Sequence, residues 1–221
     1  KNDVMAVNDF AAPFLGAGFY YKTFMWPKAF WERVYEPIIR RAAGLGGLSE
    51  KADPDIYEKA FAFCDVLIVG AGPAGLMAAK VAAASGADVI LAEEDTALGG
   101  RLLSEVEQIG GAPAIAWVRA VEAELRALPN VRIMTRTAVT GAYDQGTYGA
   151  LERVGDFGPR REGLPRACFW RIAAKRTVLC AGSLERAIAF PNNDRPGVMM
   201  AGAVRAYVNR WGVAPGVRVA V

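Results

Sequence analysis

A buried strand that runs directly into a glycine-rich turn constrains this 221-residue chain more than any other feature. Residues 65–69, DVLIV, form an almost wholly apolar run, which is typical of a strand buried on both faces. The sequence GAGPAG occupies residues 70–75, and the alanine-rich stretch 76–85 predicts a helix that ends at Gly86. Residues 88–92 predict a second buried strand. Together these elements make about thirty residues, the length of a βαβ unit with parallel strands.

The spacing of the glycines assigns a role to each of them. Gly70 allows the tight turn, Gly72 lets a pyrophosphate approach the backbone, and Gly75 lets the helix and strand pack closely. Pro73 and Ala74 lie at the start of the helix, where free N–H groups and a partial positive charge favour phosphate. The sequence therefore predicts a dinucleotide site, and the alternative is a structural turn that holds no ligand.

An acidic cluster follows the second strand. Glu93 lies 18 residues after Gly75, at the strand end, where its carboxylate can accept hydrogen bonds from both ribose hydroxyls. The charges of Glu93, Glu94 and Asp95 would repel a 2′-phosphate. The sequence therefore favours NAD over NADP.

Two further segments resemble parts of the two-dinucleotide-binding flavoproteins. Residues 98–100, LGG, are similar to the Gly-Gly turn of that class and add Gly100 to the predicted site. Residues 177–183, TVLCAGS, are similar to the strand that returns beside the dinucleotide, which adds Ala181 and Gly182. The cysteine pair of the thioredoxin reductases is missing, so dithiol reduction is not expected.

The remaining pattern predicts an α/β fold, a Rossmann-like parallel sheet of the FAD/NAD(P)-binding type with a small antiparallel β insertion at about 131–180. We expect an aromatic-rich segment and linker over residues 1–60, followed by this domain, C-terminally truncated, over residues 61–221. Residues 143–165 are rich in glycine and arginine and carry no clear pattern. Helices are predicted at 28–41, 113–128 and 198–211, and further strands at 131–134, 137–140, 169–172 and 177–181.

Residues 10–35 hold ten of the 22 aromatic side chains. Glycines and prolines interrupt them, so one amphipathic helix cannot contain them all. We expect residues 19–31 to pack against the rest of a larger subunit or its partner. The alternative is that they fold back onto residues 65–130 as an extra core layer.

The composition excludes several classes of chemistry. There is no histidine, which removes Ser-His-Asp and Cys-His catalysis and histidine-ligated metals. The three cysteines form no C-x-x-C pair, and we expect small core residues rather than disulfides.

Residues 131–221 carry 14 basic and 6 acidic side chains, and we interpret this excess as a solvated or interface surface rather than a nucleic-acid patch. No signal peptide or membrane span is predicted, so we expect a piece of a longer cytoplasmic protein.

Three collinear segments carry a closer resemblance. They are GFYYKTFMWP at residues 18–27, YEPIIRRAAGLG at 35–46 and AFPNNDRPGVM at 189–199. All three resemble the alpha subunit of heterotetrameric sarcosine oxidase, and together they span nearly the whole chain.

The resemblance implies a subunit whose flavin-type fold holds NAD, with FAD as the alternative occupant. It also implies beta, gamma and delta partner subunits, with FMN attached between alpha and beta, and FAD in the beta subunit. The complex oxidises sarcosine to glycine, reduces oxygen to hydrogen peroxide and forms 5,10-methylenetetrahydrofolate from tetrahydrofolate. Sarcosine and folate would bind outside this chain, which by itself is expected to be catalytically silent.

Carried over by position, the family's NAD contacts fall on Ala74, on Glu93 and Glu94 with Asp95 next to them, on Arg101 and on Val139. The family often has Asp-Glu at positions 93–94, and a small hydroxylic residue can follow its Gly-Gly turn, whereas this chain has Arg101 there. Arg101 either pairs with the pyrophosphate or points to solvent. Related subunits of hydrogen cyanide synthase, opine oxidase or N-methylglutamate dehydrogenase complexes, and a non-catalytic assembly scaffold, remain alternatives. The predicted cofactor site comprises Gly70, Gly72, Pro73, Ala74, Gly75, Glu93, Glu94, Asp95, Gly100, Arg101, Val139, Ala181 and Gly182.

Overall fold

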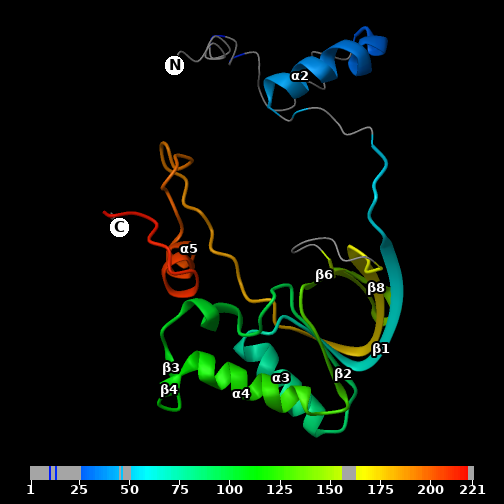
Figure 1. Ribbon diagram of the computed structural model, residues 1–221, viewed down its shortest axis with the longest axis vertical. Helices are drawn as coiled ribbons and strands as arrows, with labels where there is room; N and C mark the ends of the chain where they lie inside the picture. The colour runs from blue at the N-terminus through cyan, green and yellow to red at the C-terminus, as the bar shows by residue number, and fades with distance from the viewer. Residues whose placement is uncertain are drawn as a thin grey trace. The chain divides into compact units, whose positions relative to one another are not determined.

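The computed structural model describes residues 10, 13, 26–44, 46, 51–155 and 163–218 and divides the chain into two units, Lys1–Pro54 and Asp55–Val221 (Figure 1). In the first unit, one helical run is made of η2 (Lys28–Phe30), η3 (Trp31–Tyr35) and α2 (Glu36–Ala42). The helix predicted at 28–41 is thus confirmed. Most of the aromatic segment expected to pack against a partner, residues 19–25 included, lies outside the described residues.

The second unit is built on a six-stranded sheet with the strand order β5-β2-β1-β8-β7-β6. The pairs β5–β2, β2–β1 and β1–β8 are parallel, whereas β8–β7 and β7–β6 are antiparallel. The strands are β1 (Tyr57–Val69), β2 (Val89–Ala92), β5 (Val131–Met134), β6 (Thr137–Tyr143), β7 (Thr147–Arg153) and β8 (Ala167–Leu179). A separate two-stranded antiparallel sheet joins β3 (Gln108–Ile109) and β4 (Ala112–Pro113).

Two helices pack together beside the parallel strands (Figure 1). Helix α3 (Pro73–Ala84) links β1 to β2, and α4 (Ala114–Arg126) links the small sheet to β5. Their apolar stripes meet the strands in one core. Its buried side chains include Ile68, Leu76, Ala79, Leu91, Val118, Val121 and Leu125. This arrangement confirms the predicted Rossmann-like class, because the βαβ unit and the 113–128 helix form where the apolar spacing places them.

The sheet is more extensive than the sequence pattern indicates. Strand β1 begins at Tyr57 rather than at residue 65, and β8 is one strand where two short ones are predicted. The two strands pair in parallel from Tyr57↔Ala167 to Val69↔Leu179. The sequence pattern did not predict the first half of β1, because the charged residues there suggest a linker. Pairing with a partner about 110 residues away satisfies their backbone groups instead.

Strand β7 lies in the stretch that the sequence leaves without a pattern. A tight connection, η5 (Asp144–Gly146), turns the chain back after β6, with Gln145 at φ 59° and Gly146 at φ 68°. The antiparallel portion is therefore formed by β6, β7 and β8. Strand β5, which was expected within the insertion, belongs to the parallel portion, because it pairs with β2. The missed signal was the glycine at a left-handed turn position.

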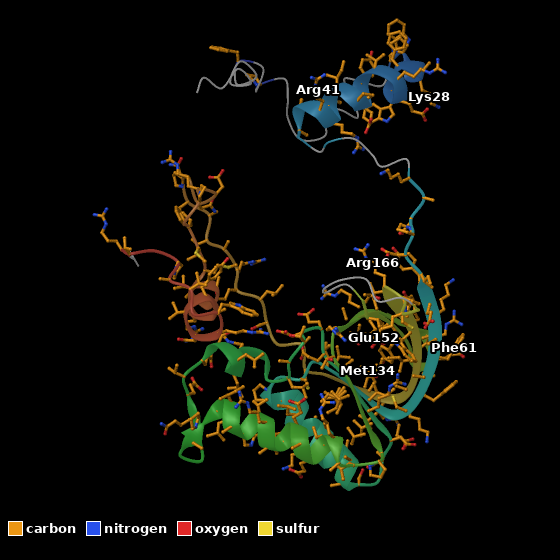
Figure 2. All side chains as sticks on the ribbon, viewed as in Figure 1. Lys28, Arg41, Phe61, Met134, Glu152 and Arg166 are labelled. Atoms are coloured by element: carbon orange, nitrogen blue, oxygen red, sulfur yellow. The ribbon has the colours of Figure 1, made fainter. Side chains whose placement is uncertain are left out.

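A second core lies where the long strands curl over β6 and β7. Ala62, Cys64, Met134, Ala150 and Ile172 are buried there. Figure 2 shows Phe61 on the outer side of β1, and its side chain is 64% exposed. Cys64 and Cys168 are buried free thiols, as the predicted core role requires, and burial raises the pKa of the Cys64 thiol to about 11.

Candidate dinucleotide site

The glycine turn follows β1 and lies between the end of β2 and the end of β8. The Gly70 N–H donates to the Ala92 carbonyl at 2.8 Å, and the Cys180 N–H donates to the Val69 carbonyl at 2.8 Å. Gly70 adopts φ 96°, and a Cβ there would lie 2.5 Å from the Cys180 oxygen. The end of β8 therefore returns directly beside this turn.

The other two glycines differ sharply in their surroundings. A Cβ at Gly75 would lie 1.9 Å from the Gly70 carbonyl oxygen, so helix and strand approach too closely for any side chain. A Cβ at Gly72 would meet no heavy atom of the described residues within 4 Å. Gly72 is the N-cap of α3, and no described side chain caps that helix end. The turn thus fits a dinucleotide, because it leaves open space at a helix N-terminus whose first turn carries Pro73 and Ala74, both exposed.

Glu93 is the buried carboxylate of the site. It is 7% exposed and comes directly after β2. Its Oε2 accepts the Ala71 N–H at 2.7 Å, and its Oε1 accepts the Asp95 N–H at 2.9 Å. The sequence predicted the carboxylate but not these bonds. Because a carboxylate has about four acceptor positions, Glu93 can tie the strand end to the glycine turn and still accept ribose hydroxyls.

The two acids after Glu93 are not equivalent. Glu94 is exposed, whereas Asp95 is partly buried and forms a bidentate ion pair with Arg210 at 2.6 and 2.8 Å. The hydrogen bonds from Arg210 lower the pKa of Asp95 to about 2. The sequence missed Arg210 altogether, since 115 residues separate it from its partner.

The Asp95–Arg210 pair is expected to make stability depend on pH in acid. The pKa of Asp95 is depressed from about 3.9 in an unfolded chain, so the pair contributes fully above about pH 4 and is lost as the pH falls toward 2. Asp95→Asn should therefore lower the free energy of unfolding at pH 7 by up to about 1 kcal/mol, since the pair is partly solvent-screened. Urea unfolding should show this gap shrinking between pH 4 and 2. A gap that is constant over that range would contradict the assignment.

The predicted Gly-Gly turn lies against the first one. The Gly99 N–H donates to the Ala71 carbonyl at 2.9 Å, and a Cβ at Gly100 would lie 3.0 Å from the Gly72 Cα. Arg101 is an exposed residue in the first turn of η4 (Gly100–Ser104), and its Nε donates to Glu105 Oε1 at 3.2 Å. The Arg101 side chain is thus exposed and paired within its own loop, and its contact with the pyrophosphate stays a prediction.

The remaining predicted residues lie on two further strands or strand ends. Ala181 and Gly182 are exposed and follow Cys180, which contacts the glycine turn. Val139 lies on β6 and packs against the second core, which also contains Ala92 at the end of β2. The structure thus brings predicted residues that follow β2 and β8, or lie on α3 and η4, to the neighbourhood of the glycine turn, whereas Val139 lies on β6, two strands beyond β8 in the sheet order.

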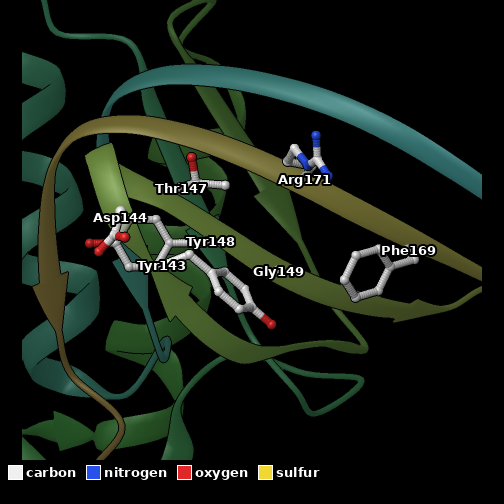
Figure 3. Close-up of a pocket in the computed structure, with 7 residues that line it drawn as sticks. All are labelled: Tyr143, Asp144, Thr147, Tyr148, Gly149, Phe169 and Arg171. Carbon is white, nitrogen blue, oxygen red and sulfur yellow. The ribbon is translucent and has the colours of Figure 1, made fainter.

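The pocket in Figure 3 lies elsewhere. It has a volume of about 440 Å³ and is lined by residues of the β6–β7 hairpin and β8, among them Tyr143, Phe169 and Arg171. Nine residues of extended chain separate Arg171 from Cys180, about 30 Å along the strand. A smaller pocket of about 230 Å³ lies between η4, the segment after β8 and the start of α5. It is lined by Arg101, Ser104, Glu105, Ser183, Leu184, Glu185, Met200, Gly202, Ala203 and Arg205.

Other kinds of site are not seen in the described part of the chain. No group of three or more cysteine, aspartate or glutamate side chains is placed to hold a metal ion among residues 26–44, 51–155 and 163–218. In the same described ranges, no helix is long and apolar enough to cross a membrane.

Comparisons with known proteins agree with the fold and with the resemblance. Residues 65–149 match the family model described as FAD dependent oxidoreductase. The alpha subunit of sarcosine oxidase from Rhizobium meliloti (strain 1021) is 54% identical over 215 residues, which are 97% of this chain and 22% of the relative. An opine oxidase subunit from Agrobacterium tumefaciens (strain Ach5) is 31% identical over 69% of this chain and 30% of its own length.

Among solved structures, L-proline dehydrogenase from P. horikoshii superimposes with a TM-score of 0.58 and 28% identity, covering 76% of this chain and 32% of that one. The fold is therefore that of the FAD/NAD(P)-binding flavoproteins. This chain spans about a fifth of the length of the sarcosine oxidase relatives that it matches.

Proposed function

We propose, from the homology of this chain to sarcosine oxidase alpha subunits, which reaches 97% of its length for the Rhizobium meliloti relative, that it is the dinucleotide-binding part of such a protein and binds NAD. The observation that carries the proposal is the buried Glu93 carboxylate, bonded to the glycine turn and followed by two more acids. That arrangement suits a ribose with free hydroxyls. Bound NAD would supply a nicotinamide that can accept hydride.

The residues of the chain would act by binding and orienting. The open N-terminus of α3 would receive the pyrophosphate beside Gly72, since backbone N–H groups there favour negative charge. Glu93 would accept the ribose hydroxyls. Gly100, Ala181 and Gly182 would border the ligand, because they lie on segments that contact the turn, and Val139 would contact it as the family's positions imply. No residue here is proposed as an acid, base or nucleophile.

The parent complex is proposed to oxidise sarcosine with oxygen and tetrahydrofolate, together with beta, gamma and delta subunits, with FAD in the beta subunit and FMN attached between alpha and beta. The names of the relatives support a role within a multi-subunit oxidase. FAD is the alternative occupant here, because the matching family model is named for it and FAD shares the adenosine and pyrophosphate of NAD.

The nucleotide can be identified directly. The intact protein, with the subunits that purify with it, should release NAD on denaturation, and mass spectrometry of the supernatant distinguishes it from FAD. The amount should approach one NAD per alpha chain, beyond any FAD and FMN from other subunits. Absence of NAD, with one extra FAD per complex instead, would contradict the NAD proposal. Absence of both extra nucleotides would favour an assembly scaffold.

A further inference from the structure

The helical segment near the described C-terminal end docks on the rim of the dinucleotide site. It consists of α5 (Ala201–Arg205) and η6 (Ala206–Arg210), and Figure 1 shows it directly beside the η4 region. Arg205 pairs with Glu105 at 3.5 Å, and Asn209 Nδ2 donates to the Ser104 carbonyl at 2.9 Å. Two side chains four positions apart thus hold the segment against the loop after β2.

This docking brings Arg210 to the end of β2. Its guanidinium makes the two parallel bonds with Asp95, and its side chain is 21% exposed. Asp95 in turn donates its N–H to Glu93, the proposed ribose ligand. The hydrogen bonds with Asp95, and to a smaller degree the charge of Glu93, raise the pKa of Arg210. The guanidinium therefore lies at the acidic strand end that would face the adenosine ribose.

An arginine at this place has a known physical consequence. In dinucleotide folds, an acidic residue at the strand end accepts the ribose 2′-hydroxyl, and an arginine nearby accommodates a 2′-phosphate. Here both charges are present, but one edge of the guanidinium, through Nη1 and Nη2, is engaged by a carboxylate of matching geometry. A 2′-phosphate that approached this edge of Arg210 would have to displace the Asp95 carboxylate, and one that approached the other N–H groups would still meet its negative charge.

We infer that Arg210 is a phosphate-competent arginine neutralised by Asp95, and that this ion pair determines the preference of the site for a ribose without a 2′-phosphate. The inference rests on the proposed dinucleotide function and adds a specificity residue that the strand-end acids alone do not provide. Removing the Asp95 charge should therefore convert an excluding site into one that accepts NADP.

Arg210 would stay in place when that charge is removed. Its guanidinium lies over the Trp211 ring, 4.5 Å from the centroid. The contacts of Arg205 and Asn209 with the η4 loop do not involve Asp95. Asp95→Asn also keeps the size of the side chain and one oxygen acceptor. The substitution thus leaves a guanidinium held at the ribose end with no countercharge on its fork.

The test compares NAD and NADP binding by calorimetry on the full-length protein after its bound nucleotide has been removed. The wild type should bind NAD and discriminate against NADP. In Asp95→Asn, the affinity for NADP relative to NAD should rise by about tenfold, the effect of a charge-assisted phosphate contact. The double variant Asp95→Asn with Arg210→Gln should lose that gain. A gain of affinity that needs the arginine cannot come from structural damage.

Asp65→Asn is the matched control, because it also removes a paired carboxylate. Asp65 Oδ1 pairs with Lys175 Nζ at 2.5 Å, and this ion pair lies away from the glycine turn. It should leave the NADP-to-NAD ratio unchanged. If Asp95→Asn binds NAD without any gain for NADP, or if the gain survives Arg210→Gln, the inference is wrong while the proposed NAD function stands. If the wild type binds neither nucleotide, the proposed function fails, and the inference fails with it.

Discussion

Gly75→Ala is expected to disrupt the dinucleotide fold itself. The added Cβ would lie 1.9 Å from the Gly70 carbonyl oxygen, and both atoms belong to backbone that helix α3 and strand β1 hold in place. Relief of this overlap requires the helix to move away from the sheet, at a cost of about 3 kcal/mol, the upper part of the range for overpacked sites. Urea unfolding of the full chain should show the loss of stability, and nucleotide analysis should find none bound.

Gly72→Val is the matched substitution three residues earlier. Its Cβ would meet no heavy atom of the described residues within 4 Å, and Gly72 has an extended conformation that valine can adopt. We therefore expect unfolding free energy within about 1 kcal/mol of the wild type, with bound nucleotide lost. Undiminished nucleotide in this variant would contradict the placement of the pyrophosphate. Equal destabilisation by both substitutions would contradict the packing described for Gly75.

Glu93→Ala is expected to affect both stability and binding. The substitution removes the acceptor of two backbone N–H groups, those of Ala71 and Asp95, within a 7% exposed environment. Leaving buried donors without a partner costs about 1–3 kcal/mol each, so a loss of about 2–6 kcal/mol in unfolding free energy is expected for the two. NAD binding should weaken by a further 1–3 kcal/mol or so, since the ribose hydroxyls lose their acceptor. Discrimination against NADP should also fall.

Glu94→Gln provides the control for charge, because Glu94 is exposed and comes next in the chain. It should leave stability within about 0.5 kcal/mol of the wild type. Thermal or urea unfolding measures the loss of stability in Glu93→Ala, and calorimetry on the nucleotide-free protein measures its loss of NAD affinity. Unchanged stability of Glu93→Ala would show that the carboxylate does not tie the strand to the turn. Equal affinity of the wild-type site for NAD and NADP would contradict the role given to the acids.

Local patterns of the sequence were sufficient for the centre of the fold. The apolar run before Gly70, the glycine spacing and the helical spacing of apolar residues over 113–128 predict the second half of β1, the turn, α3, β2 and α4, and the structure confirms each of them. These elements depend on contacts between residues near one another in the chain, so their composition carries the information. The importance of Glu93 was predictable for the same reason, because its position after β2 follows from the βαβ length.

Other features needed the tertiary structure. The first half of β1 carries charges that read as a linker, and only its pairing with β8 makes it a strand. The second bond of Glu93, to the Ala71 N–H, depends on how the turn folds back over β2. Arg210 meets Asp95 across 115 residues because a short helical segment docks on the η4 loop. Such partners leave no periodic signal, since a long-range ion pair constrains two positions and nothing between them.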